Sequence, residues 1–366
     1  MKLFSHKKRP VHLGPYPLER LPRVADPAST PLGSDGQRRG EDRQPGPHSA
    51  AHAYSLYLDL FDAERTGAIS PQAPIPDDLA ERSRNLKSGL YFLDADMAGC
   101  GIIPDEAWTG EQQPHRFAVV SLVAHTRTYG SVQPGDEWID GTRQANADLR
   151  ASELGVITAS YIRRLGFDAI AHTPTATDLD LERVALQCGL IERRHGELRA
   201  PFLKSGFALS VVSTDMELTP DAPLARRGPL ARSRSTSGLG WVLGWGGTRA
   251  GFGRLNGDHR PLHMGRYPME RIKRVEEATT LILPEEIERV PVRAGGFPRA
   301  ANGDMGPKFE ADVKVFAFKT PQAQSYVQQI AAMVPYQDGD TADTPAPRTS
   351  DPGHNANALK ALAHHL

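Results

Sequence analysis

The sequence predicts a protein of the α+β (mixed α/β) class, in which helices pack on a central sheet. Two apolar runs that are rich in β-branched residues, Phe117–Ala124 and Phe207–Thr214, are typical of buried strands. Between them, apolar residues recur at steps of three and four over Thr142–Leu165, and Gly166 follows. That spacing predicts one long amphipathic helix that the glycine ends. The alternation of strands and helices indicates helices layered on a sheet.

Three shorter elements complete the predicted core. Phe167–His172 has the composition of a strand, and Leu179–Cys188 that of a second helix, which ends at Gly189. A later helix is predicted to begin at Thr320-Pro321, where threonine can cap and proline suits the first helical position. We expect the three strands to share one sheet and the long helix to pack its apolar stripe on that sheet, through Leu149, Leu154, Ile157 and Tyr161.

Composition excludes several classes of protein. The 366 residues are 39% hydrophobic and 24% charged, with a net charge of −1, so nothing draws the chain as a whole to nucleic acid or to a membrane. The first ten residues, MKLFSHKKRP, lack the apolar stretch of a secretory signal, and we expect a cytoplasmic protein. Two cysteines, Cys100 and Cys188, are too few for a disulfide framework or a cysteine-ligated iron–sulfur cluster.

An internal repeat is the most informative feature of the sequence. His12–Val24 (HLGPYPLERLPRV) and His263–Val275 (HMGRYPMERIKRV) are identical at eight of thirteen positions, at an offset of 251 residues. We call them the first and second repeat segments. A fainter match follows at an offset of 273, where three residues recur: Leu86, Lys87 and Leu93 correspond to Leu359, Lys360 and Leu366. We interpret the pattern as a duplicated architecture whose second unit is cut off just after it begins.

Segments with the composition of linkers divide the chain into four parts. Residues 1–50 are predicted to be an N-terminal arm that is partly disordered, since Asp26–Ala50 holds one large aliphatic residue. Residues 51–224 are the predicted core. Residues 225–336 hold a Gly/Arg-rich loop, the second repeat segment and a helix. Residues 337–366 are a linker, with Gln337–Asn357 as its polar part, and the truncated start of a second unit.

Generic catalytic motifs are absent from the sequence. It contains no P-loop, no GxSxG elbow and no HExxH helix. Gly238, Gly240 and Gly244 give GxGxxxG without a preceding strand, which favours a flexible loop over a dinucleotide site. The arginines of 226–234 are best interpreted as a solvated loop, and both cysteines as small buried hydrophobic residues. We therefore assign no catalytic residue and no metal ligand, and the cofactor-binding residues stay unknown.

Two stretches of the predicted core resemble a known family. Ser152–His172 and Ala185–Leu224 are similar to the core of reductive dehalogenases and, more distantly, of epoxyqueuosine reductases. The first repeat segment resembles the start of the soluble, non-exported branch of reductive dehalogenases, so the resemblance is to the N-terminal half of such a protein. The matching motifs are Tyr161-Ile162-Arg163 with Leu165-Gly166, Cys188-Gly189-Leu190, and Thr214-Asp215 with Leu218, Asp221 and Pro223.

Departures from the family pattern bear on the function. The resemblance implies cysteine runs after Asp221-Ala222-Pro223, which would hold two iron–sulfur clusters that reduce a bound corrinoid, but no cysteine follows here. The segment His172–Asp180 lacks the tyrosine that would donate a proton, and Ile191 replaces the second glycine of a Gly-Leu-Gly turn. The core of residues 51–224 is therefore interpreted as vestigial.

The resemblance implies an oxidoreductase family, with this chain inactive alone. We expect the non-catalytic N-terminal half of a corrinoid-dependent reductive dehalogenase, a protein that removes halide from an organohalide. Cobalamin and iron–sulfur clusters are expected only in the missing C-terminal half, which is the expected partner, on the same or a downstream polypeptide. Nucleic acid and membrane partners are not expected, and homo-oligomerisation stays open. The alternative is a stand-alone binding or interaction module that keeps the fold without redox chemistry.

Overall fold

The structure is a computed structural model that covers the whole chain. It describes residues 9–25, 37–38, 50–126, 134–139, 141–203, 206–225, 260–265, 269–277, 280–281, 283–286, 294–315, 319–338, 343 and 350–366. Most of the predicted disordered arm and almost all of the Gly/Arg-rich loop, with its three glycines and its arginines, lie outside these residues.

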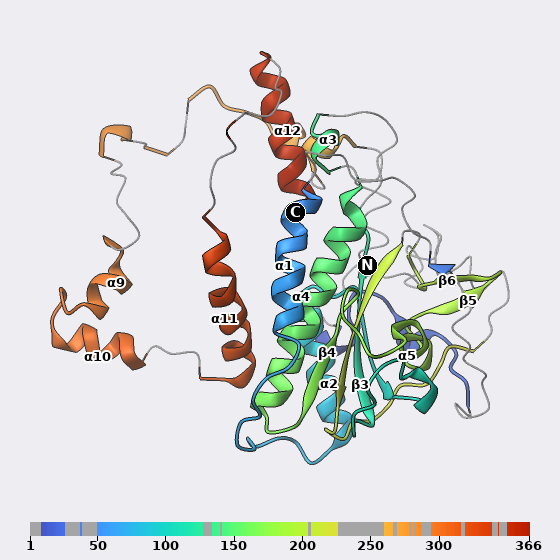
Figure 1. The fold of residues 1–366 in the computed structure, drawn as a ribbon. Coiled ribbons are helices and arrows are strands. Elements are labelled where there is room, and N and C mark those ends of the chain that lie inside the picture. Colours follow the sequence, from blue (N-terminus) through green and yellow to red (C-terminus); the bar gives the residue numbers. More distant parts are fainter. Residues whose placement is uncertain are drawn as a thin grey trace.

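A four-stranded antiparallel sheet forms the centre of the core (Figure 1). Its strand order is β2 (Met97–Ile102), β3 (Phe117–Ala124), β7 (Phe207–Thr214) and β4 (Ala169–His172). All three predicted strands therefore lie in one sheet, as expected, although β4 begins two residues later than the sequence indicated. The sheet and its helices confirm the predicted α+β class.

Strand β2 is an edge strand that the sequence did not reveal. Its glycines make it a poor strand former, yet they let the strand lie close to the turn after α5. A Cβ added to Gly101 would lie 2.5 Å from Cys188 Sγ, and one added to Gly99 would lie 3.2 Å from Cys188 Cβ. The close approach of these two backbone segments requires residues without side chains.

Helices cover one face of the sheet. The long helix α4 (Thr142–Arg164) packs on β7, β3 and β4, as the apolar stripe predicted, and Gly166 follows it with φ +96°. Helices α1 (Ala51–Ala63), α2 (Leu79–Phe92) and α11 (Pro321–Met333) pack in turn on α4 (Figure 1). Thr320 caps α11 through a hydrogen bond that its Oγ1 accepts from Ala323 N–H at 3.3 Å, which confirms the predicted cap.

The opposite face carries a second apolar layer. Helix α5 (Leu181–Gln187) is shorter than predicted, because the Asp180 side chain caps it by accepting from Arg183 N–H at 3.0 Å. Alternate residues of β7 serve the two layers: Phe207, Leu209 and Val211 join the α5 side, whereas Ala208 and Val212 join the α4 side. Every residue of β7 is buried, so this strand links both cores.

The remaining elements are short or lie at the margins of the core. A small second sheet has the order β1 (Gln37–Arg38), β6 (Glu197–Arg199) and β5 (Glu192–Arg194). The other described helices are η4 (Asp105–Ala107), α3 (Asp136–Ile139), η7 (Pro284–Glu286), α9 (Gly296–Ala301), α10 (Pro307–Val315) and η9 (Val334–Tyr336). In the described part of the chain, no helix is both long enough and apolar enough to cross a membrane.

The two repeat segments each lie against a helix. The first forms η1 (Val11–Leu13) and η2 (Leu18–Arg20) and packs on α2. The second forms η5 (Leu262–Met264) and η6 (Met269–Arg271), and its η5 packs on α12 (Pro352–His365). The prediction of a linker over Gln337–Asn357 is thus wrong from Pro352 onward, because the Asp351 side chain caps a helix there by accepting from Gly353 N–H.

The local geometry of the two repeat segments is nearly identical. Gly14 follows η1 with φ 62° and ψ −172°, and Gly265 follows η5 with φ 64° and ψ −164°. A Cβ on Gly14 would lie 2.3 Å from the ring of Tyr91 in α2, and one on Gly265 would lie 2.6 Å from the ring of His364 in α12. Tyr91 and His364 are themselves 273 residues apart, so the helices correspond as the faint sequence match indicated.

An ion pair also recurs at the repeat offset. The Arg9 guanidinium pairs with the Glu19 carboxylate at 2.7 Å, and Arg260 pairs with Glu270. Each arginine also donates to the carbonyl oxygen of the equivalent residue, Leu13 or Met264. The two segments therefore share backbone conformation, ion pair and helix contact.

Candidate functional site

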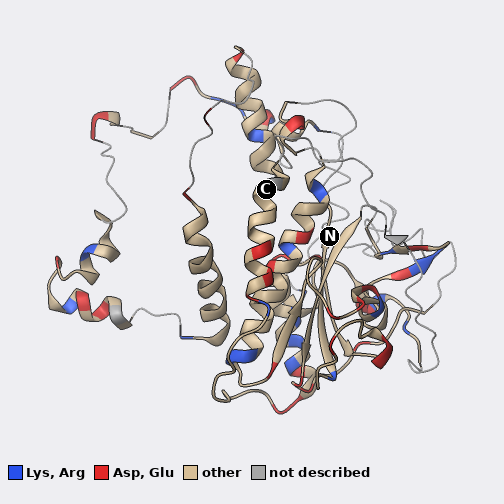
Figure 2. Cartoon of the chain, in the orientation of Figure 1, with Lys and Arg blue, Asp and Glu red and all other residues tan. Residues whose placement is uncertain are grey.

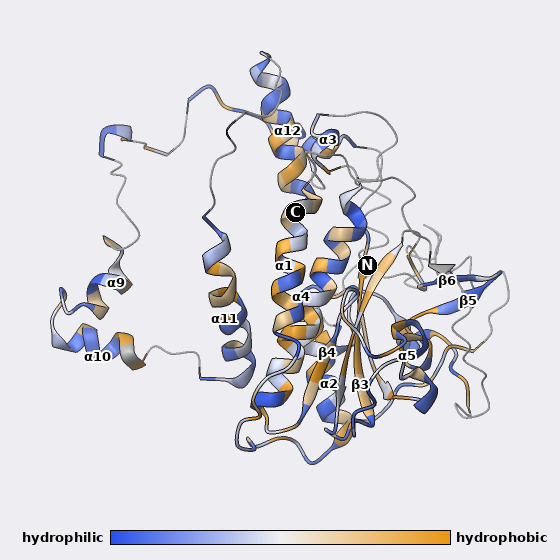
Figure 3. Cartoon of the chain, in the orientation of Figure 1, coloured by the Kyte–Doolittle hydropathy of each residue, from blue (hydrophilic) through white to orange (hydrophobic). Residues whose placement is uncertain are grey.

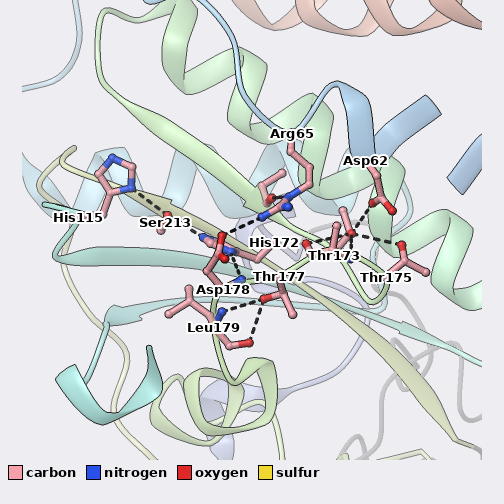
Figure 4. A network of polar contacts seen from close by, with 12 residues as sticks. Asp62, Arg65, His115, His172, Thr173, Thr175, Thr177, Asp178, Leu179 and Ser213 are labelled. Atoms are coloured by element: carbon pink, nitrogen blue, oxygen red, sulfur yellow. Dashed lines mark hydrogen bonds and ion pairs between the residues drawn. The ribbon is translucent and has the colours of Figure 1, made fainter. Parts of the chain in front are cut away.

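A chain of buried polar side chains joins β4 and β7 beside β3 (Figure 4). Ser213 on β7 lies at its centre. The Ser213 Oγ is 2.9 Å from His172 Nε2 on β4 and 2.9 Å from Nδ1 of His115, which precedes β3. His115 Nε2 lies 3.1 Å from Asp168 Oδ2.

One backbone N–H sets the direction of the hydrogen bonds at His172. The Asp178 N–H donates to His172 Nδ1 at 3.3 Å, so that nitrogen carries no proton and Nε2 must. His172 Nε2–H then donates to Ser213 Oγ, and the Ser213 hydroxyl donates to His115 Nδ1. On the other side of its ring, His115 Nε2 lies close to the Asp168 carboxylate but is not aligned for a hydrogen bond with it.

Charged and hydroxyl groups surround the His172 end of the network (Figure 4). Arg65, just after α1, donates through Nε to the Ala171 carbonyl oxygen at 2.7 Å and lies 3.3 Å from the Asp178 carboxylate. The Thr173 hydroxyl donates to Asp62 at 2.6 Å. These bonds tie the end of β4 to α1.

The combination of serine, histidine and aspartate has the residue types of a nucleophilic site, but the geometry does not suit one. Ser213 is fully buried, and its oxygen is already shared between two imidazoles. Burial lowers the pKa of His172 to about 3, so this imidazole is neutral and cannot accept a proton near neutral pH. The network ties strands together and offers no nucleophile to a substrate.

A second polar cluster lies where α2, β2 and residue 221 meet. Lys87 Nζ is 2.6 Å from Asp221 Oδ2, and the same carboxylate oxygen accepts from the Cys100 N–H at 2.8 Å. Burial opposes the charge of Lys87, but the Asp221 carboxylate outweighs it and the pKa of the ammonium is raised. The Asp of the family motif therefore holds α2 against the edge strand β2.

Both cysteines are buried and free, as predicted. Cys100 belongs to the apolar layer on the α4 side and Cys188 to the layer on the α5 side. Burial raises the pKa of Cys100 to about 12 and also raises that of Cys188. Within the described ranges, no three His, Cys, Asp or Glu side chains are grouped to hold a metal ion.

The glycine turn of the family motif is filled by the chain's own N-terminal arm. Gly189 has φ +63°, and a Cβ there would lie 1.8 Å from Arg23 Nη1. Arg23 Nη1 donates to three carbonyl oxygens, at 3.2 Å to Cys188, 3.1 Å to Gly189 and 2.7 Å to Ala222. The Val24 N–H donates to the Pro223 carbonyl oxygen at 2.9 Å, which fixes the arm along the Asp-x-Pro element.

Comparison with known proteins identifies the relatives of this chain. No family model matches it, and no curated protein matches it. Solved structures do. A reductive dehalogenase, whose structure suggests a mechanism for B12-dependent dehalogenation, is 39% identical with a TM-score of 0.88. The chain is related to the reductive dehalogenases. The catabolic reductive dehalogenase NpRdhA, N-terminally tagged, is 38% identical with a TM-score of 0.86, and its complex with 3-bromo-4-hydroxybenzoic acid gives 39% and 0.87.

The similarity extends over the whole of this chain but over only part of each matched reductive dehalogenase. Each match covers 100% of this chain and 52% of the other, so the chain spans about half the length of the dehalogenases it matches. The predicted resemblance is thereby confirmed.

The residues present do not fit a corrinoid at the turn that the family motif indicates. The Arg23 guanidinium lies against Gly189, and Ile191 stands where a second glycine would let the backbone approach a large ligand. Arg23 was not identified from the sequence, because it is 166 residues from Gly189. His115, Ser213, Lys87 and Asp221 were likewise not recognised as partners, since no local motif joins residues so far apart.

Proposed function

We propose that the chain is the non-catalytic N-terminal half of a corrinoid-dependent reductive dehalogenase. The complete protein would remove halide reductively from an organohalide, and this half would brace the half that carries out the chemistry. The support is that all of this chain, but only 52% of each matched dehalogenase, takes part in the similarity. The remaining length of such a protein is close to that of a second unit of this size.

The duplicated repeat segments are the strongest support for the proposal. In the first unit, η1 and α2 lead into β2 and the rest of the sheet. In the second, η5 and α12 reproduce that start, including the left-handed glycine and the arginine–glutamate pair. A repeated start of this quality favours an internal duplication, in which a second unit of the same fold follows α12.

The chemistry is assigned to that second unit. A cubane iron–sulfur cluster needs about four thiolates, and the sequence has two cysteines, which are buried in different layers. Reduction of a corrinoid needs a nearby electron relay, because the cofactor carries the chemistry and the protein supplies placement and potential. The filled turn at Gly189 and the absence of tyrosine from His172–Asp180 support the same assignment.

The test compares residues 1–366 with the complete protein under anaerobic conditions. Each is supplied with cobalamin, reduced viologen and a brominated phenol, and halide release is measured against free cobalamin. We expect halide release above that background from the complete protein alone. Cobalamin retained after gel filtration is measured in parallel, and residues 1–366 should retain none.

Two results would contradict the proposal. Halide release well above background from residues 1–366 would show that this half is catalytic. A protein that ends at residue 366 in its natural gene, and that folds as a stable monomer, would favour the stand-alone binding module instead. An Arg23→Ala variant of residues 1–366 serves as a further control, because it opens the turn at Gly189. If this variant retains cobalamin while the unaltered chain does not, Arg23 is the obstacle.

A further inference from the structure

Helix α11 packs on the core through Met333 at its end and through polar side chains along its length. Ser325 and Gln329 are buried, at 1% and 4% exposure. Where α11 meets α4, the Gln328 side chain also accepts a hydrogen bond from the Arg164 guanidinium at 2.6 Å. Tyr326 and Ile330, in contrast, are 41% and 43% exposed. A surface helix normally shows the reverse arrangement, with its apolar stripe toward the core.

The exposed apolar residues of α11 form one continuous stripe. Tyr326, Ile330 and Val334 are spaced four residues apart, so their side chains lie one above the other on a helix. Val334, directly after α11, is 51% exposed. We call these three residues the outward stripe. The helix between Pro321 and Met333 contains no lysine, arginine, aspartate or glutamate, as its uniform tan colour in Figure 2 shows.

The same imbalance extends through the last third of the chain. Among the described residues, sixteen of the twenty exposed large hydrophobic side chains lie after residue 260, against four in residues 9–225. Figure 3 shows α9, α10 and α11 to one side of the α1–α4 layer, with apolar colour on parts of each helix among hydrophilic parts. The helices of this region expose more large apolar side chains than they bury, which is typical of a surface that another body covers.

We propose that the outward stripe of α11 is the centre of the surface on which the second unit docks. This inference rests on the proposed function, since the second unit is the half of the dehalogenase that this chain does not span. An uncharged helix face with an aromatic and two branched aliphatic side chains has the composition of an interface core. The partner is therefore an apolar helix or sheet face of a second α/β unit.

Continuity with α12 favours the second unit over other occupants. Only residues 334–351 separate α11 from α12, the helix with which the proposed second unit begins. Leu359 on α12 is 61% exposed, whereas its equivalent Leu86 on α2 is 3% exposed. A unit that covers Leu359 as the first core covers Leu86 would therefore begin soon after α11 along the chain.

Thiol labelling tests this placement directly. The two native cysteines of this chain are buried, so Ile330→Cys provides one accessible thiol in residues 1–366. Ile69→Cys is the matched control, because Ile69 is 50% exposed in the loop between α1 and α2. Both variants are prepared in residues 1–366 and in the complete protein, and the labelling rate at each position is read by peptide mass spectrometry.

We expect the complete protein to slow labelling at position 330 by roughly ten-fold or more, with little change at position 69. Equal rates at position 330 in an active complete protein would overturn the docking surface and leave the proposed function intact. A complete protein that binds cobalamin without releasing halide would overturn the proposed function, and this inference with it. Protection at position 330 that rises with concentration in residues 1–366 alone would identify a second copy as the occupant and would also overturn the inference.

A charge at the same position provides a second readout. Ile330→Glu should leave the melting temperature of residues 1–366 nearly unchanged, because the side chain is exposed there. In the complete protein, Ile330→Glu should lower the melting temperature. Ile330→Leu, which keeps an apolar side chain at this position, should leave the melting temperature of the complete protein nearly unchanged. Equal effects of Ile330→Glu in the two proteins would contradict the proposal.

Discussion

The two repeat segments and their helices have the same local structure, but several equivalent side chains are buried in the first copy and exposed in the second. Around the first, Leu86 and Leu18 are buried, at 3% and 6% exposure. Around the second, Leu359 and Met269 are 61% and 54% exposed. Backbone conformation is thus set within each segment, by the glycine and the arginine–glutamate pair, and does not need the core that the first copy contacts.

The difference shows that the local sequence specifies the backbone conformation of each copy, whereas contacts with the core decide whether its side chains are buried. Lys87 pairs with Asp221 from a distant part of the chain, whereas its equivalent Lys360 is exposed. The second copy therefore carries side chains suited to burial, and among the described residues no strand lies after it to bury them. Three predictions test how far the two copies differ, in order of the expected effect, and a fourth concerns the core itself.

Truncation of the equivalent leucines should give the largest contrast. Leu86→Ala should lower the free energy of unfolding by about 3 kcal/mol, because it leaves a cavity in a packed core. Leu359→Ala should change it by less than about 0.5 kcal/mol, because that side chain is exposed. Urea denaturation of both variants measures the difference. Similar losses for the two variants would show that α12 is covered in residues 1–366.

Removal of the equivalent lysine charges should give a smaller contrast. Lys87→Gln leaves the Asp221 carboxylate without its cation and should cost about 2 kcal/mol or more. Lys360→Gln should be nearly neutral, within about 0.5 kcal/mol. Thermal unfolding at low and high salt is the measurement. An Asp221→Asn variant and the Lys87→Gln/Asp221→Asn double variant complete a double-mutant cycle. If the effects of the two single changes simply add in the double variant, the two side chains do not interact directly.

Substitution of the equivalent glycines should lower the stability slightly less than loss of the Lys87 charge. Gly14→Ala and Gly265→Ala both place a Cβ at positive φ, which should cost about 1–2 kcal/mol each in local stability. The cost should be larger at Gly14, because Tyr91 is held in the core while His364 is exposed and can move. Limited proteolysis near each segment would report the local effect. A neutral Gly14→Ala change would contradict the requirement for a left-handed residue.

Acid should destabilise the core through His172. Its pKa is about 3 in the folded chain, against an ordinary value near 6.5. Between these two pH values the unfolded chain binds a proton that the folded chain does not, so stability falls as the pH falls. The slope from this group is about 1.4 kcal/mol per pH unit near pH 5.

His172→Gln should make the loss of stability with acid shallower by about that slope, although the variant starts from a lower stability. His195→Asn is the control, since His195 is exposed at the β5–β6 turn and has positive φ that asparagine tolerates. His365 on α12, whose pKa burial lowers to about 4, should add a smaller part of the acid effect. An unchanged pH profile in His172→Gln would rule out this imidazole as the origin.

The sequence predicted the parts of the fold whose local pattern is strong. α4, β3 and β7 were predicted because their apolar periodicity is continuous over eight residues or more. β2 was not, because Gly99, Cys100 and Gly101 have no strand pattern and are paired only through the neighbouring strand. The start of α12 was mistaken for a linker, since its composition is polar and its cap, Asp351, resembles a loop residue.

The polar clusters could not be predicted from one sequence. His115 and Ser213 are 98 residues apart, and Lys87 and Asp221 are 134 apart, so only the folded sheet brings them together. The family motif marked Asp221 but not its lysine. The repeat, by contrast, was visible in the sequence, because it depends on similarity within short segments.

The hydrogen bonds at Ser213 give the buried chain a polarity. A single backbone N–H, that of Asp178, can only donate, and it therefore decides which nitrogen of His172 is protonated. His172 is in the Nε2-protonated form, and its N–H points to Ser213 Oγ, 2.9 Å away. Nitrogen chemical shifts of the His172 ring would register this tautomer, which one peptide group at the end of the row enforces.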